Sequence, residues 1–215
     1  MTFQRARRPE HKRQRYEAIL AAARSLAERD GVRAVSLADI AGAVGMHKSA
    51  LLRYFETREE IYLHLAADDW RGWAEAMRAA LATLADGDVA GVASALATTL
   101  AERPLLCDLM THAPLNLERN VSLETARTFK RAAVGSVDGI GAQIRTVLPK
   151  LGERDAFELV GAVGMVAAGL WQIGHPPATL VELYKEEPRL GHEHLPFVPT
   201  ITRMAETIIL GLLAR

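Results

Sequence analysis

The sequence predicts an all-α protein in which an N-terminal three-helix helix-turn-helix unit precedes a larger all-helical domain. Ala, Leu, Glu and Arg dominate the 215 residues, and 49% of the residues are hydrophobic. Apolar residues recur at three- and four-residue steps almost throughout, and no long run of alternating β-branched residues is present. The length allows one large domain or two small ones.

The composition excludes several classes of protein. Cys107 is the single cysteine, so the chain has neither an internal disulfide nor a zinc site of the CxxC type. The N-terminus lacks the apolar segment of a signal peptide, and glycine and prolines interrupt the longest uncharged stretch, residues 159–181. We therefore expect a cytoplasmic protein that does not span a membrane.

Charge is unevenly distributed although the net charge is zero. Residues 1–55 contain 11 Lys and Arg against 5 Asp and Glu, whereas residues 56–215 contain 15 against 21. A basic end on an acidic chain indicates a segment that meets a polyanion, and a merely solvated basic tail is the alternative.

Three helices are expected in the first 55 residues. The first covers residues 11–29 and ends at Gly31, which is a typical C-terminal cap. The second covers residues 37–44, with Ser36 and Asp39 as a capping box and Gly45 as its stop. The third covers residues 47–55 and directs Leu51 and Phe55 toward the core.

A long fourth helix follows a capping unit at Thr57 and Glu60, in which each side chain bonds the backbone amide of the other. Its apolar stripe runs to Leu81, so this helix links the two parts of the chain. Further helices are expected over residues 89–102, 104–111 and 117–148.

The helix expected over residues 153–173 is apolar nearly all round, so both of its sides must be covered, and a second subunit is an economical cover. Small residues on it allow close backbone approach. A final helix, residues 197–213, also has an apolar face. The predicted dimer interface comprises Phe157, Val160, Gly161, Gly164, Ala168, Ile201, Ala205, Ile208 and Leu212.

Residues 174–196 contain four prolines and are expected to form a long loop with one helical turn near residues 180–185. His175, His192 and His194 have a spacing compatible with a metal cluster, but no carboxylate or thiolate sits at a convincing position beside them, so we expect a solvated loop without a metal.

Two short amphipathic helices joined by a tight glycine turn are the arrangement that presents a helix to the DNA major groove. Residues 36–61 also closely resemble the DNA-binding signature of the TetR family of transcriptional regulators. The similar positions are Ile40, Ala41, Gly45, Lys48, Leu51, Tyr54, Phe55 and the unit from Thr57 to Glu60. The chain departs from the family at His47, Ser49 and Leu52, where the family usually has Ser, Gly and an aromatic residue, which puts the operator sequence in doubt.

The resemblance implies a homodimeric regulator with a DNA-binding domain at residues 10–58 and a ligand-binding and dimerisation domain at residues 59–215. Its partners are a double-stranded DNA operator and a small, largely apolar effector that releases the DNA. No cofactor is implied.

Side-chain chemistry supplies the candidate DNA contacts. Residues at the start of the third helix reach phosphates and base edges first, Arg53 offers a bidentate fork, and the Tyr54 hydroxyl can donate to phosphate. Arg58 matches the place where the family typically has a backbone-contacting Lys. The predicted DNA-binding residues are Ser36, Leu37, Met46, His47, Lys48, Ser49, Arg53, Tyr54 and Arg58. The basic residues before position 16 either form a DNA-contacting arm or a disordered tail.

A mixture of aromatic, apolar and occasional polar residues marks a candidate ligand pocket, although each of these residues also suits a plain core. The candidates are Trp70, Trp73, Met77, Cys107, Met110, His112, Phe129 and Trp171.

The sequence holds no nucleophile elbow, P-loop, dinucleotide fingerprint or HExxH motif, so an enzyme is not expected. Two alternatives remain beside a ligand-released repressor. One is a ligand-independent DNA-binding regulator, and the other is a small-molecule-binding helical protein that does not bind DNA sequence-specifically.

Overall fold

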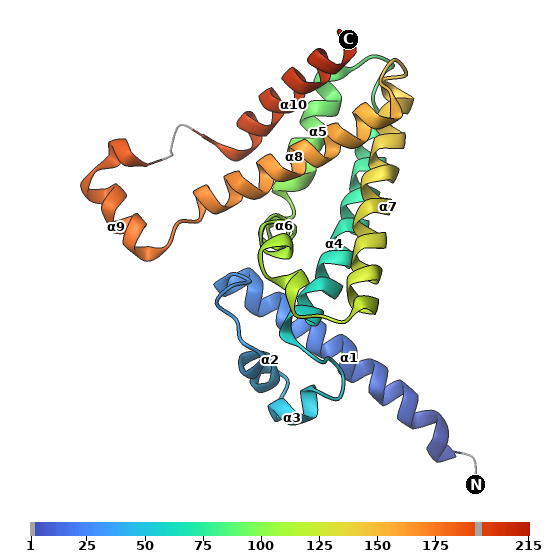
Figure 1. Cartoon of the computed structure of the whole chain (residues 1–215), viewed down its shortest axis with the longest axis vertical. Helices are drawn as coiled ribbons and strands as arrows, with labels where there is room; N and C mark the ends of the chain where they lie inside the picture. Colours follow the sequence, from blue (N-terminus) through green and yellow to red (C-terminus); the bar gives the residue numbers. More distant parts are fainter. Residues whose placement is uncertain (1–2, 192–194) are drawn as a thin grey trace.

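The computed structural model describes residues 3–191 and 195–215, and these residues contain helices and no strand (Figure 1). The helices are α1 (Phe3–Asp30), α2 (Leu37–Ala43), α3 (Lys48–Leu51), α4 (Arg58–Leu81), α5 (Val89–Ala101), α6 (Pro104–Leu115), α7 (Leu123–Val147), α8 (Glu153–Gly174), α9 (Ala178–Glu186) and α10 (Phe197–Leu213), with short 3-10 turns at Leu117–Arg119 and Pro188–Leu190. The all-α prediction is confirmed.

Helices α1, α2 and α3 form the N-terminal unit at one end of the molecule (Figure 1). The turn after α1 starts at Gly31, whose φ of 83° favours glycine and whose N–H donates to the Ala27 carbonyl. Ile19, Ile40, Leu51 and Phe55 are fully or almost fully buried together, so the core predicted for this unit is present.

The third helix is shorter than predicted. The Arg53 and Tyr54 amides donate to carbonyls three residues earlier, at Ala50 and Leu51. These tighter bonds turn the chain after α3, and they allow Phe55 to enter the core, where its ring stacks on Tyr16 with centroids 4.7 Å apart.

Helix α4 joins the two halves of the chain. Its first half belongs to the same buried cluster as α1, α2 and α3, together with Leu105 and Phe129, and its second half belongs to the cluster of the C-terminal helices. A two-bond contact between Arg24 and Asp69, at 2.6 and 3.2 Å, ties α1 to α4. The N-terminal unit therefore shares its core with the domain that follows it.

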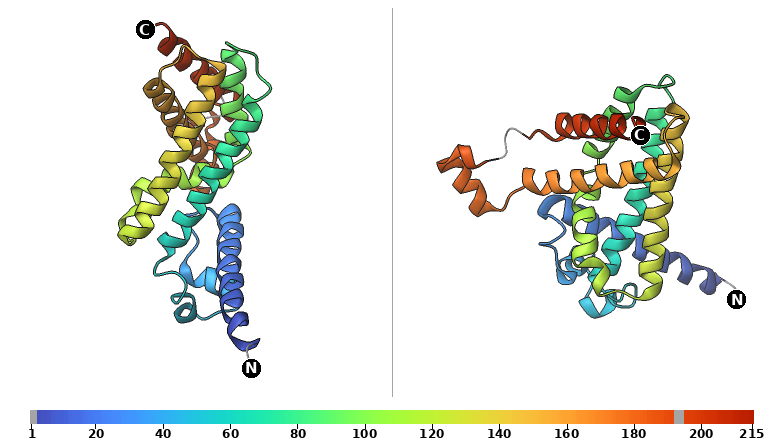
Figure 2. Two further views of the ribbon diagram at one scale, coloured as in Figure 1. Left: turned by 90° about the vertical axis from the view of Figure 1, so that its right-hand side faces the viewer. Right: turned by 45° about the horizontal axis from the view of Figure 1, so that its top comes forward.

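The C-terminal helices pack around the second half of α4. Helix α7 lies along α4, and α5 lies between α4 and α10 (Figure 2). Trp73 is fully buried, and its indole Nε1 donates to the Thr99 hydroxyl on α5 at 2.9 Å. The hydroxyl in turn donates to the Ala95 carbonyl, so the polar atoms of this buried pair are satisfied.

The helix expected over residues 117–148 is interrupted. A 3-10 turn at Leu117–Arg119 precedes α7, and Ser122 starts α7 by accepting a hydrogen bond from the Thr125 amide. The short polar side chains of Asn116, Asn120 and Ser122 favour turns and caps over a helix interior, which explains the break. Helix α6 also runs further than expected, through Pro114.

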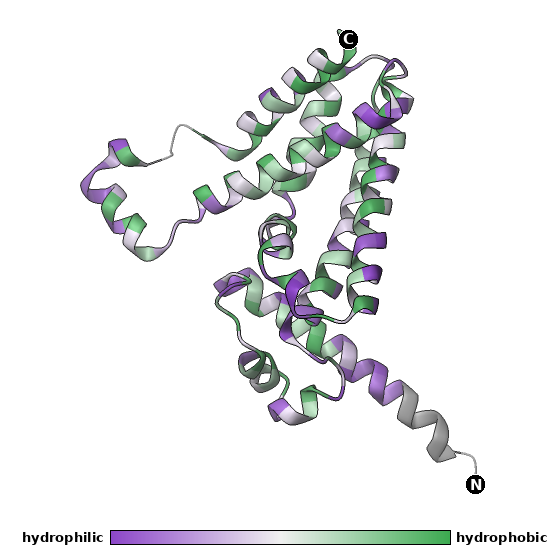
Figure 3. Ribbon diagram, viewed as in Figure 1, coloured by the Kyte–Doolittle hydropathy of each residue, from purple (hydrophilic) through white to green (hydrophobic). Residues whose placement is uncertain are grey.

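Helix α8 is pale or green along most of its length in Figure 3, with hydrophilic residues at its start. By length and composition it is the one helix in residues 3–191 and 195–215 that is apolar enough to cross a membrane. It packs on α6, α7 and α10, and one side of it is buried in the core that these helices share. Its apolar character therefore matches that of a core helix.

The segment expected to be a long loop holds a complete helix. Helix α9 extends over nine residues, none of which is buried, and it projects from the bundle between α8 and α10 (Figure 2). Helix α10 begins and ends where predicted, and its buried face is centred on Ile201, Ala205 and Ile209.

Candidate nucleic-acid interface and interdomain cleft

The α2–α3 unit has a rigid backbone. The Ser36 hydroxyl accepts from the Asp39 amide, and the Asp39 carboxylate accepts from the Ser36 amide at 2.8 Å, so the predicted capping box is present. Hydrogen bonds from Ser36 lower the pKa of Asp39 below its usual value. Gly45, at φ 64°, makes the turn to α3, and the Met46 amide closes it on the Ala41 carbonyl.

The side chains predicted to reach DNA lie on the outside of this unit. Ser36, His47, Lys48, Ser49 and Arg53 are exposed. Leu37, Met46 and Tyr54 are half-buried and pack against the core of the unit. These eight residues lie on or beside α2 and α3, whose Ile40 and Leu51 are buried in the core of the unit.

Arg58, which the sequence analysis predicted to contact DNA, does not lie free on this surface, because its guanidinium is bound within the protein. Its guanidinium Nε donates to the Val35 carbonyl at 2.5 Å, and a second nitrogen donates to the Val32 carbonyl. A third contact joins it to Glu59, and only 19% of the side chain is exposed. Arg58 therefore holds the α1–α2 turn against the start of α4.

The cap at the start of α4 differs in one detail from the prediction. The Thr57 hydroxyl accepts from the Glu60 amide at 3.1 Å as expected. The Glu60 carboxylate, however, accepts from the amide of Glu56 at 2.6 Å and not from that of Thr57. The Glu60 side chain reaches one residue further back than predicted, so one backbone donor before the helix and one in its first turn are satisfied.

The backbone of the basic N-terminal segment is helical from Phe3 and continues into α1. Lys12 and Arg15 are exposed, and Arg13 pairs with Glu10 at 2.9 Å on the same helix. The N-terminal part of α1 extends away from the other helices (Figure 1).

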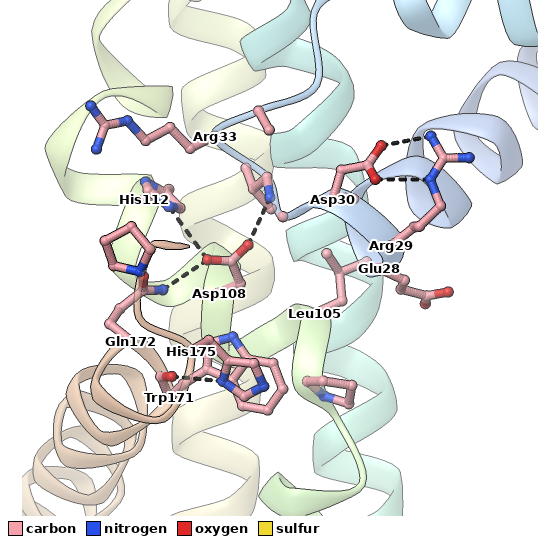
Figure 4. Close-up of a pocket in the computed structure, with 16 residues that line it drawn as sticks. Glu28, Arg29, Asp30, Arg33, Leu105, Asp108, His112, Trp171, Gln172 and His175 are labelled. Atoms are coloured by element: carbon pink, nitrogen blue, oxygen red, sulfur yellow. Dashed lines mark hydrogen bonds and ion pairs between the residues drawn. The ribbon is translucent and has the colours of Figure 1, made fainter. Parts of the chain in front are cut away.

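A cleft of about 680 Å³ lies between the N-terminal unit and the C-terminal helices. The end of α1 and the α1–α2 turn form one wall, and α6 with the end of α8 forms the other (Figure 4). Asp108, His112, Trp171, Gln172 and His175 line the second wall. The cleft thus has walls from both functional halves of the chain.

Asp108 is the polar centre of the cleft, and its residue is only 8% exposed. One carboxylate oxygen accepts from the Val32 amide at 2.8 Å, and the other accepts from Gln172 Nε2 at 2.8 Å and lies 3.4 Å from His112 Nε2. Burial alone raises the pKa of Asp108, but the hydrogen bonds from His112, Val32 and Gln172 outweigh it and lower the pKa. The carboxylate is therefore ionised at neutral pH.

The predicted ligand residues fall into three groups. Trp73, Met77, Cys107 and Phe129 are buried in the core, where the first three belong to one cluster and Phe129 to the other. Trp70 and Met110 are half-buried against the core. His112 and Trp171 line the cleft, and they are the pair that the structure brings together.

Sequence reasoning missed Asp108 and Gln172 as cleft residues. Asp108 is the single acidic residue of α6, and His112 follows it four residues later. A lone acid in an apolar helix with a His one turn further on is a signal for a buried polar pair. His175, considered in the sequence for a metal, stacks on Trp171 with centroids 3.7 Å apart. Positions 192 and 194 lie outside the described residues, and residues 3–191 and 195–215 contain no cluster fit for a metal.

The predicted dimer residues divide by burial. Val160, Gly164, Ala168, Ile201 and Ala205 are buried within the chain. Their helical spacing marks an apolar face without showing what covers it. Phe157, Gly161, Ile208 and Leu212 retain exposed area.

Apolar side chains also remain exposed on the outward sides of α8 and α10. Met165 is 73% exposed on α8, and Met204 and Leu210 are exposed on α10. Gly161 and Gly169 lie on the same side of α8 as Met165, where they allow close approach of another backbone.

A buried three-helix core that carries two short helices with exposed polar and basic residues, and that shares α4 with a helical bundle, defines a helix-turn-helix DNA-binding protein. Two family models match the chain. The model for "Bacterial regulatory proteins, tetR family" matches residues 19–65, and that for "Tetracyclin repressor-like, C-terminal domain" matches residues 67–215. The chain belongs to the TetR family of transcriptional regulators.

Solved structures show the same fold at low sequence identity. The TetR-family repressor FadR from Thermus thermophilus, in complex with lauroyl-CoA, is 18% identical over 92% of this chain and 93% of its own, with a TM-score of 0.57. A TetR-family regulator from Mesorhizobium loti MAFF303099 is 14% identical over 94% and 96%, with a TM-score of 0.58. FadR from Bacillus halodurans is 14% identical over 91% and 98%, with a TM-score of 0.54. No curated protein sequence matches the chain significantly.

Proposed function

We propose that the protein is a homodimeric transcriptional repressor that binds a pseudo-palindromic operator and releases it when a small molecule binds its C-terminal domain. It acts in the cytoplasm, by binding and not by catalysis. Residues 10–58 are the DNA-binding domain and residues 59–215 the ligand-binding and dimerisation domain. The exposed polar and basic stretch around α2 and α3, on a fully buried core, is the observation that carries this proposal.

Within the DNA-binding surface, Lys48 and Arg53 are the principal cationic contacts. Both are exposed, and both lie on or directly after α3, which enters the major groove. Lys48 contacts phosphate or guanine, and Arg53 offers two parallel donors to guanine or to a phosphate. His47, Ser49 and Tyr54 surround them and set the register.

The test of the DNA-binding surface is a titration of a fluorescent mixed-sequence duplex at several salt concentrations. Lys48→Ala and Arg53→Ala each lower the affinity and reduce the log–log salt slope by about 1, because each removes one cation from a polyanion contact. Lys150→Ala is the matched control, since Lys150 is an exposed cation in the α7–α8 turn. Equal binding by all four proteins contradicts the assignment of α2–α3 as the DNA surface.

Dimerisation through the outward face of α8 and α10 accounts for the apolar area left there. Phe157, Met165, Met204 and Leu210 are 42–73% exposed. Exposed apolar side chains on two helices that pack together suit an interaction surface. A twofold pairing of the same face on two chains also places two α3 helices on one DNA duplex.

Sedimentation velocity tests the dimer. Met165→Glu introduces two buried charges into a twofold interface, one from each chain, and we expect it to yield monomers. Leu123→Glu is the control, because Leu123 is 74% exposed at the start of α7, away from this face. A Met165→Glu protein that sediments as the wild type does contradicts this interface.

Release by a small molecule is supported by the cleft between the two halves of the chain, because a ligand there touches both. The fold also accommodates a small molecule in a relative, since FadR from Thermus thermophilus was solved with lauroyl-CoA. A ligand releases DNA if it binds more tightly to a conformation that does not fit the operator. If no small molecule changes DNA affinity, the protein is a ligand-independent regulator.

A further inference from the structure

Val32, in the turn between α1 and α2, is bound by residues of both α6 and α4. Its amide donates to Asp108 on α6, and its carbonyl accepts from Arg58 at the start of α4. The turn leads directly to Ser36, which caps α2. A change in the hydrogen bonds of Asp108 therefore affects the backbone before α2 directly, through Val32. The effect does not have to be transmitted along α4.

The cleft beside Asp108 has the size and place of a ligand site. Its volume of about 680 Å³ lies within the range of roughly 300–1,000 Å³ that is typical of small-molecule sites, and such sites are frequent between domains. Trp171 supplies an aromatic ring, and Leu105 and Pro177 supply apolar area. Figure 4 shows Asp108 and His112 on one side of the cleft and the Trp171–His175 stack below them.

The charge of the lining favours a cation. Glu28, Asp30 and Asp108 are acidic, whereas Arg29 and Arg33 are basic. The Arg29 guanidinium is already bound to Asp30 through two hydrogen bonds of 2.6 and 2.8 Å. The lining thus has one more negative than positive charge, and its most buried charged group is a carboxylate.

Hydrogen-bond accounting at His112 points the same way. Its Nε2 lies 3.4 Å from the Asp108 carboxylate, which favours the hydrogen on Nε2 and leaves Nδ1 as an acceptor. Nδ1 is buried and has no partner among the described residues. The polar centre of the cleft therefore consists of the Asp108 carboxylate, backed by a buried nitrogen that donates nothing to it, and the carboxylate is the group that suits the N–H groups of a ligand.

We propose that this interdomain cleft binds a small organic cation with an apolar or aromatic body, such as an amidinium or ammonium compound. The cation binds the Asp108 carboxylate in competition with the Val32 amide, and its body packs against Trp171. Loss of the bond to Val32 frees the α1–α2 turn and lowers DNA affinity. This inference rests on the proposed function only for its effect on DNA, because binding in the cleft is measured without DNA.

Three compounds of almost equal shape test the charge requirement: benzamidine as cation, benzamide as neutral isostere and benzoate as anion. Two-dimensional NMR of the free protein monitors the Val32 amide and the Trp171 indole N–H. Benzamidine shifts both signals saturably, whereas benzamide and benzoate bind at least tenfold more weakly. Equal or tighter binding of benzoate overturns the proposal.

Two variants assign the site. Asp108→Asn keeps the shape of the side chain and removes its charge, so benzamidine binding falls at least tenfold. Arg33→Glu changes an exposed residue at the rim without disturbing the core, and it strengthens benzamidine binding about two- to fivefold at low salt. Asp138→Asn, an exposed carboxylate on α7, leaves binding unchanged and is the matched control. Unchanged binding in both Asp108→Asn and Arg33→Glu overturns the assignment.

DNA affinity, measured in parallel, separates the two proposals. Benzamidine lowers the DNA affinity of the wild type and not that of Asp108→Asn. Binding of benzamidine with no change in DNA affinity overturns the competition with Val32. A protein that binds benzamidine through Asp108 but binds no DNA through α2–α3 contradicts the proposed function while the ligand site stands.

Discussion

Replacement of Arg58 by Met distinguishes two roles for this residue. In one role Arg58 contacts DNA, and in the other it stabilises the protein by binding backbone carbonyls. Met keeps the aliphatic stem that packs near Tyr62 and removes the guanidinium, which lies 4.9 Å from the Tyr62 ring centroid. The change removes the hydrogen bonds to the carbonyls of Val32 and Val35. It adds no polar group to the core and leaves the α2–α3 surface unaltered.

We expect Arg58→Met to lower the free energy of unfolding by a large amount for one residue near the surface. A hydrogen bond to a charged group contributes about 1.5–3 kcal/mol to stability. Near the surface, water can bind the freed carbonyl and offset part of this loss. Two such bonds therefore give a loss of about 3 kcal/mol in the free energy of unfolding. For a chain of this length, that corresponds to a fall of roughly 6–12 °C in Tm.

Calorimetry and salt-dependent DNA binding together decide between the roles. If Arg58 has the structural role, Arg58→Met lowers the Tm and weakens DNA binding with an unchanged salt slope, because no phosphate contact is lost. Arg58→Lys recovers part of the stability, since an ammonium can reach one carbonyl but not both in the same geometry. An unchanged Tm with a salt slope reduced by about 1 refutes this reasoning and makes Arg58 a phosphate contact.

Four further predictions follow from individual contacts. Lys48→Met, the counterpart of the Arg58 experiment, leaves Tm unchanged within about 1 °C and reduces the salt slope by about 1; a large loss of Tm contradicts a purely external role. Thr99→Val deprives the buried Trp73 indole of its acceptor and costs about 1–3 kcal/mol in urea unfolding, whereas Thr99→Ser retains the hydroxyl and serves as the control; equal stability of the two variants argues against the bond. Cys107 does not react with a thiol reagent at pH 8 until urea is added, because burial first, and the nearby Asp108 charge second, raise its pKa to about 12; rapid labelling of the folded protein contradicts this environment. The low pKa of Asp108 stabilises the folded chain above the unfolded pKa of about 4, and this contribution is lost as pH falls through the folded value; the stability difference between wild type and Asp108→Asn therefore narrows below about pH 4, and a difference constant with pH contradicts it.

Local signals account for the parts of the fold that sequence reasoning predicted well. Ser36 with Asp39, the glycines at positions 31 and 45, and Thr57 each act within a few residues of chain, and all of them cap or turn the backbone as predicted. Apolar periodicity also placed α8 and α10 almost to the residue. These features depend on neighbours in sequence, so one sequence contains enough information to locate them.

The contacts that sequence reasoning did not predict depend on partners far along the chain. Arg58 follows the exposed α2–α3 unit closely in the sequence. Its guanidinium, however, donates hydrogen bonds to carbonyls that lie 23 and 26 residues earlier. Val160 and Ile201 lie on apolar faces, and periodicity does not say whether the same chain or a second one covers such a face. The cleft at Asp108 joins positions 32, 108 and 172, and no local pattern links them.

The central claim is that two α3 helices of a dimer read DNA sequence, and selection from random duplex DNA tests it most directly. Repeated rounds of binding and amplification are followed by sequencing, with Lys48→Ala and Arg53→Ala as test variants and Lys150→Ala as the control. The account predicts that the wild type and Lys150→Ala enrich one inverted repeat, which neither test variant enriches. Weak binding without any enriched sequence contradicts the claim and leaves a helical protein that binds small molecules without reading DNA.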